Sequence, residues 1–213
     1  MDKPYVVYGA NGGGSVPVEA VLTLLGLPYE VVEAPAWESE EVRERIAPIN
    51  PMRQIPALVL PSGEVLTESA AILMWLAELD PEGKLAPPPG DPRRAAYLRW
   101  MTFIPAAIYS MFWIRDVPSR LAEGEAAIEL IKARTLERIA ECWRAMDSQV
   151  EPARYLLGDE LTVLDIYVAV VSRWSPRRER FYQEAPKMAE VVRRVDAEPR
   201  LQAFWAERFP FED

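Results

Sequence analysis

Apolar and polar positions change their spacing repeatedly along the first eighty residues. Short apolar runs predict strands at 5–8, 29–34, 56–60 and 64–66. Helical spacing predicts helices at 15–26, 39–47 and 68–79, the last capped by Thr67. A helix between the first two strands predicts a parallel pair, and the close spacing of the last two predicts an antiparallel hairpin. The order β-α-β-α-β-β-α therefore predicts a small mixed sheet covered by helices.

The pattern changes after the proline-rich segment DPEGKLAPPPGDP at 80–92. Beyond it only helical spacing is found, at 92–116, 121–149, 162–174, 186–196 and 199–207. Pro105 is expected to kink or interrupt the first of these helices. We therefore expect an α/β domain at 1–80, a linker at 81–91 and an all-α domain at 92–213.

The net charge of −9 over 213 residues makes non-specific nucleic-acid binding an unfavourable hypothesis, because that binding needs a basic surface. No apolar run approaches the about 20 residues of a membrane-spanning helix. The first residues, MDKPYVVYGA, do not have the pattern of a signal peptide. These features predict a cytoplasmic protein with neither a nucleic-acid nor a membrane partner.

Histidine is absent and Cys142 is the single cysteine. Catalysis by Ser-His or Cys-His pairs, disulfides within the chain and CxxC redox chemistry are therefore excluded. A metal site would need carboxylates alone, and no acidic cluster has calcium-loop spacing, so no metal is expected. Cys142 itself lies in a predicted amphipathic helix, where a buried structural role is expected.

The sequence GANGGGS at 9–15 joins the first strand to the first helix. A glycine-rich loop in this place suits close approach of a ligand, either a nucleotide phosphate or a thiol. The dinucleotide interpretation fails because GxGxxG spacing is missing and the third strand enters a hairpin.

A second motif, NPMRQIPAL, spans 50–58. Pro56 opens the third strand, and the preceding Ile55-Pro56 bond is a candidate cis peptide. A cis bond would turn the backbone N–H and C=O of Ile55 outward, toward an extended ligand. An ordinary trans turn is the alternative.

A third motif, LTESAAI at 66–72, places Glu68 and Ser69 at a helix N-terminus. Ser69 can donate to a carboxylate and Glu68 can accept from an ammonium group, which suits an α-amino acid head group. The alternative is a simple cap, with Thr67 as the capping residue and an acid in the first turn.

Two further features lie in the second half. Thr162 and Asp165 have capping-box spacing, which predicts a structural helix start. The run RWSPRRER at 173–180 holds several arginines, which either attract an anionic substrate or form a solvated helix end.

These motifs, taken in order over essentially the whole chain, resemble the cytosolic glutathione transferase family. The resemblance implies a thioredoxin-like N-terminal domain followed by an all-helical C-terminal domain, and a homodimer. It also implies glutathione as co-substrate, added as thiolate to a small hydrophobic electrophile or used to reduce a peroxide. A non-catalytic glutathione- or ligand-binding protein of the same fold is the alternative.

The resemblance also implies roles for individual residues. Ile55, beside a cis-Pro56, should pair with the cysteinyl backbone of glutathione. Glu68 and Ser69 should hold the γ-glutamyl group, and Gln54 should reach the glycine end. Arg53 stands where glycine is common in the family, as either an extra carboxylate contact or a solvent-facing substitution.

The thiolate of glutathione is the nucleophile, and a free thiol has a pKa of about 8.5. One or two hydrogen bonds to the sulfur suffice to lower this pKa by about 2 units. The family's donor lies near the first strand–helix junction, where this chain offers Ser15, then Asn11, then Tyr8. The backbone amides of 12–15 are a further option.

Overall fold

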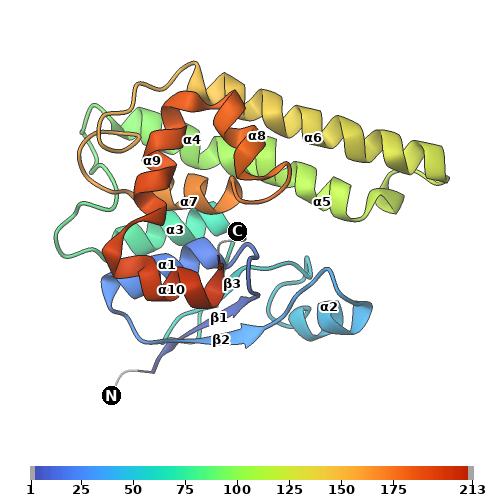
Figure 1. The fold of residues 1–213 in the computed structure, drawn as a ribbon. Coiled ribbons are helices and arrows are strands. Elements are labelled where there is room, and N and C mark those ends of the chain that lie inside the picture. Colours follow the sequence, from blue (N-terminus) through green and yellow to red (C-terminus); the bar gives the residue numbers. More distant parts are fainter. Residues whose placement is uncertain (1–2, 211–213) are drawn as a thin grey trace. The chain divides into compact units, whose positions relative to one another are not determined.

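The computed structural model describes residues 3–210, which form two compact units (Figure 1). The first unit contains the chain up to Ala86 together with the chain from Val195 onward. The second unit is the segment Pro87–Arg194.

The first unit contains a four-stranded mixed sheet. Its strands are β1 (Tyr5–Gly9), β2 (Tyr29–Glu33), β3 (Ala57–Val59) and β4 (Val65–Thr67), arranged in the order β2-β1-β3-β4. β1 and β2 are parallel, whereas β3 is antiparallel to both β1 and β4. The predicted parallel pair and the predicted hairpin are both confirmed.

Three helices complete the predicted βαβαββα order: α1 (Val16–Leu25), α2 (Glu40–Ile46) and α3 (Ser69–Ala77). α1 and α3 pack against each other, and both bury most of their side chains. α1 ends at Gly26, whose φ of 65° is the left-handed conformation of a helix stop. These contacts fix the position of the α1 N-terminus behind the loop that follows β1.

The chain from Val195 onward adds a short 3₁₀ turn (Pro199–Leu201) and helix α10 (Gln202–Arg208) to this first unit. Both elements pack on α1 (Figure 1). Leu201, Phe204 and Trp205 are buried. The sequence pattern assigns this segment to the helical domain; in the structure it groups with the first unit through its contacts with α1.

The second unit is helical. It contains α4 (Arg94–Phe103), α5 (Ser110–Asp116), a 3₁₀ turn (Pro118–Arg120), α6 (Glu125–Asp147), α7 (Val163–Val171), α8 (Arg177–Glu184) and α9 (Pro186–Asp196). A π-helical segment, Ile104–Tyr109, separates α4 from α5. Pro105 lies in that segment, so the predicted interruption is found where proline removes a backbone donor.

Helix α8 was not predicted from the sequence. The basic run at 173–180 was interpreted mainly as a solvated helix end, yet a helix starts inside it, at Arg177. Phe181 of α8 is buried and packs edge-to-face against Trp143 of α6, with ring centroids 5.1 Å apart. This one aromatic anchor holds a helix whose first residues are almost all charged, so the apolar signal was too short to detect.

The capping box at the start of α7 is confirmed. Both the backbone N–H and the hydroxyl of Thr162 donate to Asp165, at 2.8 and 2.7 Å. The backbone N–H of Leu156 donates to the other carboxylate oxygen at 2.8 Å. Complete burial raises the pKa of Asp165 to about 6, although the hydrogen bonds from Leu156 and Thr162 act in the opposite direction.

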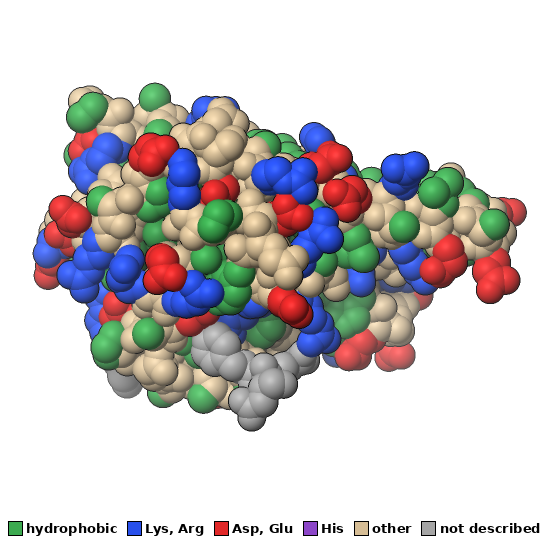
Figure 2. Space-filling model, turned by 45° about the horizontal axis from the view of Figure 1, so that its top comes forward, with side chains coloured by type: hydrophobic (Ala, Val, Ile, Leu, Met, Phe, Trp, Pro, Cys, Tyr) green, Lys and Arg blue, Asp and Glu red, His purple; other side chains and the backbone are tan. Residues whose placement is uncertain are grey.

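Acidic and basic side chains are interspersed over the face seen in Figure 2. Within residues 3–210, helices with enough length and apolar character to cross a bilayer are not found.

Candidate functional site

Strand register brings the three sequence motifs to one end of the sheet. Tyr8 of β1 lies opposite Ala57 of β3, and Ala57 lies opposite Thr67 of β4. The glycine loop follows Tyr8, the Ile55-Pro56 bond precedes Ala57, and Glu68 follows Thr67. Segments separated by tens of residues therefore meet at this end of the sheet.

The loop at 9–15 is folded by its own hydrogen bonds and by one from a distant segment. The N–H of Gly13 donates to the carbonyl of Ala10 at 2.9 Å. The N–H of Gly12 donates to the carbonyl of Arg208 at 3.0 Å. The loop is thus attached directly to the end of α10.

Three glycines of the loop make room for protein side chains. A Cβ on Gly9 would lie 2.1 Å from Oγ of Ser15, which is a steric overlap. A Cβ on Gly13 would lie 3.1 Å from the Trp37 ring, and one on Gly12 would lie 3.4 Å from the Phe209 ring. Close packing of Ser15 and Trp37 therefore favours glycine at positions 9 and 13, whereas at position 12 the φ of 65° favours it.

Ser15 is fully buried at the start of α1. Its Oγ accepts a hydrogen bond from the N–H of Ala10 at 3.0 Å and donates to Glu19 Oε1 at 2.6 Å. It makes no helix-capping bond. The single hydroxyl proton of Ser15 is directed to Glu19, although its predicted role toward the thiol is not tested by these contacts.

Glu19 is also fully buried and forms an ion pair with Arg208. Nε of Arg208 lies 2.5 Å from Glu19 Oε2, and Nη1 lies 2.6 Å from Glu33 Oε1, at the end of β2. Burial opposes the guanidinium charge, but the hydrogen bonds to Glu19 and Glu33 outweigh it and raise the Arg208 pKa. A charged network thus connects α1, β2 and α10.

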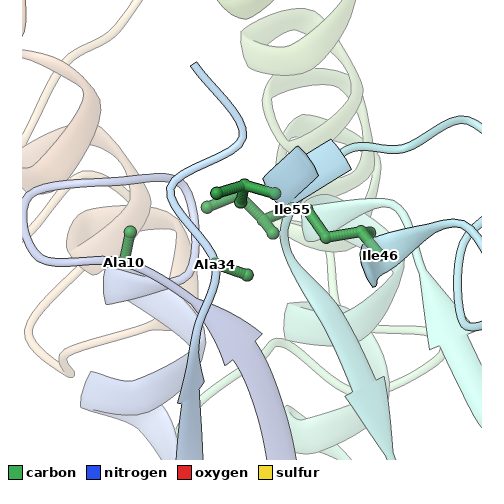
Figure 3. Packing of buried hydrophobic residues seen from close by; sticks show 5 residues of the cluster. Ala10, Ala34, Ile46 and Ile55 are labelled. Atoms are coloured by element: carbon green, nitrogen blue, oxygen red, sulfur yellow. The ribbon is translucent and has the colours of Figure 1, made fainter. Parts of the chain in front are cut away.

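The other two donor candidates lie in different surroundings. Asn11 is exposed at the turn of the loop, and its side-chain amide has no hydrogen-bond partner among residues 3–210. Tyr8 is half-buried and packs against an apolar cluster. The labelled members of that cluster come from four separate segments (Figure 3): Ala10, Ala34, Ile46 and Ile55.

Two buried amides lie where the loop enters α1. Within the described part of the chain, the N–H groups of Gly14 and Ser15 have no hydrogen-bond partner. The first N–H groups of a helix lack partners within the helix and carry its partial positive charge. These amides are therefore potential donors to a negatively charged group.

The Ile55-Pro56 peptide bond is cis, as the resemblance implied. Asn50 closes the preceding turn: its Nδ2 donates to the carbonyl of Gln54 at 2.8 Å, and its Oδ1 accepts from Met52 N–H at 3.0 Å. Neither backbone group of Ile55 has a hydrogen-bond partner in the region 3–210. Its N–H and C=O are thus available for an extended ligand, and the side chain of Gln54 is exposed beside them.

Arg53 is partly exposed and forms ion pairs with α2. Its Nη1 lies 2.7 Å from Glu40 and 2.8 Å from Glu44, both on α2. Its φ of 56° lies in the left-handed region that favours glycine, which accounts for the glycine common here in the family. The residue connects the turn to α2.

Glu68 is the N-cap of α3, with φ 65° and ψ 104°, and its side chain makes no capping bond. The prediction of Thr67 as the cap is wrong, because that residue ends β4. Left-handed backbone at a glutamate costs on the order of 1–3 kcal/mol and is concentrated at ligand sites. The Glu68 carboxylate is exposed, and Ser69 beside it is buried.

The described residues contain no group of three or more His, Cys, Asp and Glu side chains able to hold a metal ion. Cys142 is buried, its Sγ lies 3.6 Å from the Ala107 carbonyl, and burial raises the thiol pKa. Its surroundings are those of a structural cysteine.

Sequence reasoning missed four residues around the loop: Glu19, Trp37, Arg208 and Phe209. One signal was available, since Glu19 stands among apolar residues in the first turn of a buried helix. A buried acid calls for a cationic partner. Nothing in the sequence identified that partner as a residue 189 positions away.

Two family descriptions match this chain. Residues 15–79 match "Glutathione S-transferase, N-terminal domain" and residues 121–208 match "Glutathione S-transferase, C-terminal domain".

Individual proteins are similar over most of the chain. The "Uncharacterized GST-like protein YncG" of Escherichia coli (strain K12) is 32% identical, over 92% of this chain and 94% of that protein. A maleylpyruvate isomerase of Ralstonia sp is 33% identical, over 88% of this chain and 87% of its own. A crystal structure of a glutathione transferase homologue from Sulfitobacter, with bound glutathione, has a TM-score of 0.81 at 24% identity, covering 96% and 97% of the two chains.

Proposed function

The chain belongs to the glutathione S-transferase family, and we propose that it binds reduced glutathione and uses the thiol in catalysis. The observation that carries this proposal is the register Tyr8–Ala57–Thr67. This register brings Ile55, Glu68 and the glycine loop to one end of the sheet, which supports the proposal that they share one ligand.

The residues at this end of the sheet fit a γ-glutamyl tripeptide. The free N–H and C=O of Ile55 suit antiparallel pairing with the cysteinyl unit. The carboxylate of Glu68, not used in capping, suits the α-ammonium group, and Ser69 at the α3 N-terminus suits the α-carboxylate. Gln54 is proposed for the glycine end, and Arg53 for holding α2 beside it through Glu40 and Glu44.

When bound, glutathione supplies the nucleophilic thiol. We assign its side-chain donor as Asn11, placed ahead of Ser15, because the Ser15 hydroxyl donates to Glu19 whereas the Asn11 amide has no partner in the described region. The amides of Gly14 and Ser15 add the partial positive charge of the α1 N-terminus. Hydrogen bonds to a charged group contribute about 1.5–3 kcal/mol each, enough to lower a thiol pKa by one to two units.

The proposed reaction is addition of the thiolate to a small hydrophobic electrophile, or reduction of a peroxide. Isomerisation of a maleyl diacid is the second candidate, favoured by the 33% identity to a maleylpyruvate isomerase. The non-enzymatic alternative is a protein that binds glutathione without catalysing a reaction.

The test has two stages. Calorimetry should show saturable binding of reduced glutathione, weakened at least tenfold in Glu68→Gln and unchanged in the exposed-turn control Ser62→Ala. Turnover is then measured with chlorodinitrobenzene, cumene hydroperoxide and a maleyl diacid. Binding without turnover on any of these would leave the non-catalytic alternative, and absence of binding would overturn the proposal.

Ultraviolet absorbance of bound thiolate tests the donor assignment. Asn11→Ala is expected to raise the pKa of the bound thiol by about one unit, the equivalent of one lost hydrogen bond. Tyr8→Phe should leave it unchanged. An unchanged value in Asn11→Ala would contradict the assignment.

We also propose that the protein forms a homodimer in the cytoplasm. Light scattering coupled to gel filtration and cell fractionation measure these two properties, and a monomeric mass at micromolar concentration would contradict the first.

A further inference from the structure

We infer that Arg208 and Glu19 are positioning residues of the thiol site, through which the segment that follows the helical unit holds the glycine loop in its working conformation. The inference rests on the proposed function, because it concerns the same loop. Neither residue belongs to a motif that marks the site in the sequence.

Arg208 reaches the loop by two independent routes. Its backbone carbonyl accepts the N–H of Gly12 at 3.0 Å. Its guanidinium holds Glu19, which accepts from the Ser15 hydroxyl, which in turn accepts from the N–H of Ala10. One residue of α10 therefore fixes both Ala10 and Gly12.

Asn11 stands between those two fixed residues. Its own side chain and N–H have no partner in the described part of the chain, so nothing else of Asn11 holds the amide in place. The direction of the Asn11 side chain thus depends on how firmly its two neighbours are held. A loss of Arg208 would release both neighbours at once.

Side-chain packing around the loop also links it to the segment that contains Arg208. The Phe209 ring lies against Gly12, and the space occupied by Ser15 Oγ leaves no room for a Cβ on Gly9. The loop sequence is therefore adapted to the network as well as to a ligand. A loop selected only for ligand approach would not require glycine at Gly9, which is buried beneath Ser15.

Electrostatics act in the same direction. Arg208 faces two carboxylates, Glu19 and Glu33, and Tyr29 and Glu207 lie close enough to interact with the network. Removing the guanidinium would leave negative charge behind the loop, which disfavours a thiolate in front of it. Loss of position and loss of charge balance should both raise the thiol pKa.

The experiment measures the ultraviolet thiolate absorbance of bound glutathione against pH in three full-length variants. Arg208→Met is expected to raise the bound thiol pKa by about one unit, with a tenfold lower kcat below that pKa. Its Kd for glutathione should change less than threefold, since Ile55, Glu68 and Ser69 remain. Arg208→Lys, which keeps the charge but not the fork geometry, should lie between Arg208→Met and the wild type.

Arg200→Gln is the matched control, because Arg200 lies in the same segment and its Nε forms an ion pair with Glu198, two residues away, at 2.7 Å. It should match the wild type. If Arg208→Met does not fold, the double variant Glu19→Gln/Arg208→Met removes both buried charges and is expected to show the same raised thiol pKa.

The outcomes separate the two proposals. A wild-type protein that does not bind glutathione overturns the proposed function and this inference together. A wild type that binds, with an unchanged thiol pKa in Arg208→Met or in the double variant, overturns this inference alone.

Discussion

Among residues 3–210, Glu19 in the first unit and Asp165 in the second are completely buried carboxylates, and they are held in opposite ways. Glu19 in the first unit faces a cation, Arg208, and a hydroxyl from Ser15. Asp165 in the second unit faces only neutral donors, the N–H of Leu156 and the N–H and hydroxyl of Thr162. The charge of Glu19 is balanced by the charge of Arg208, whereas the carboxyl group of Asp165 is surrounded by hydrogen-bond donors without net charge.

This difference determines whether the stability that each site contributes responds to loss of a partner or to pH. An ion pair in the interior is strongly destabilised when one partner is removed, because the other remains charged and unsolvated. A buried carboxylate without a cation can take up a proton instead: burial raises the pKa of Asp165 to about 6, although its hydrogen-bond donors lower it. Glu19 should therefore respond to mutation of its partner, and Asp165 to pH.

The largest effect is expected from Arg208→Met, which leaves Glu19 buried without its cation. Loss of one partner of a buried pair costs on the order of 3–5 kcal/mol of unfolding free energy. Equilibrium urea unfolding measures it. The double variant Glu19→Gln/Arg208→Met should recover at least half of the loss, and an Arg208→Met protein within about 1 kcal/mol of the wild type would show that the pair is not effectively buried.

Asp165→Asn addresses the second site through pH. The native pKa of Asp165 is about 6 and its unfolded value is 3.8, so the native state binds more protons between these values. The stability that this group contributes is fully present below pH 3.8 and is lost as pH rises through 6. The stability advantage of wild type over Asp165→Asn should thus shrink by about 2 kcal/mol between pH 4 and pH 7.

That difference is to be measured by urea unfolding of both proteins at several pH values, which cancels the titration of all other groups. A difference that stays constant with pH would mean that the pKa of Asp165 is the same in the native and unfolded states.

Ser15→Ala has an intermediate expected effect. It removes the hydroxyl between Ala10 and Glu19 and leaves a buried N–H without a partner, at a cost of about 1–3 kcal/mol. The bound-thiol pKa of this variant should rise less than that of Asn11→Ala. The reverse order would restore Ser15 as the preferred donor to the sulfur.

Thr162→Val should have the smallest effect, about 1 kcal/mol, because Asp165 keeps its two backbone donors. Thr162→Ser, which keeps the hydroxyl, provides the control and should be close to neutral by thermal unfolding. A loss in Thr162→Ser without a loss in Thr162→Val would assign the stabilisation to the methyl group of Thr162.

The same contrast explains how much the sequence predicted. The Thr162–Asp165 box spans three residues, so its spacing was sufficient to predict it. The parallel first pair, the hairpin, and the choice of Ile55, Glu68 and Ser69 as candidates likewise came from local patterns and an ordered set of motifs. The Glu19–Arg208 pair joins residues 189 apart, and no local pattern specifies which arginine returns to which buried acid.

Helix α8 was missed for a related reason. Its first turn is arginine-rich, and its anchor, Phe181, is recognisable only once α6 supplies Trp143 against it. Likewise, the backbone of Glu68 and Arg53 has positive φ at residues that ordinarily avoid it, so propensity pointed to other conformations.

The addition of α10 to the first unit also sets an order of events during synthesis on the ribosome. Strands β1 to β4 emerge early, yet Glu19 has no cation and Gly12 no acceptor until the ribosome has made the whole helical unit and residue 208 after it. At about 5–20 residues per second, this interval lasts on the order of ten seconds or more. For that time Glu19 lacks its counter-ion, and the loop acquires its full set of contacts only after residue 208 has been made.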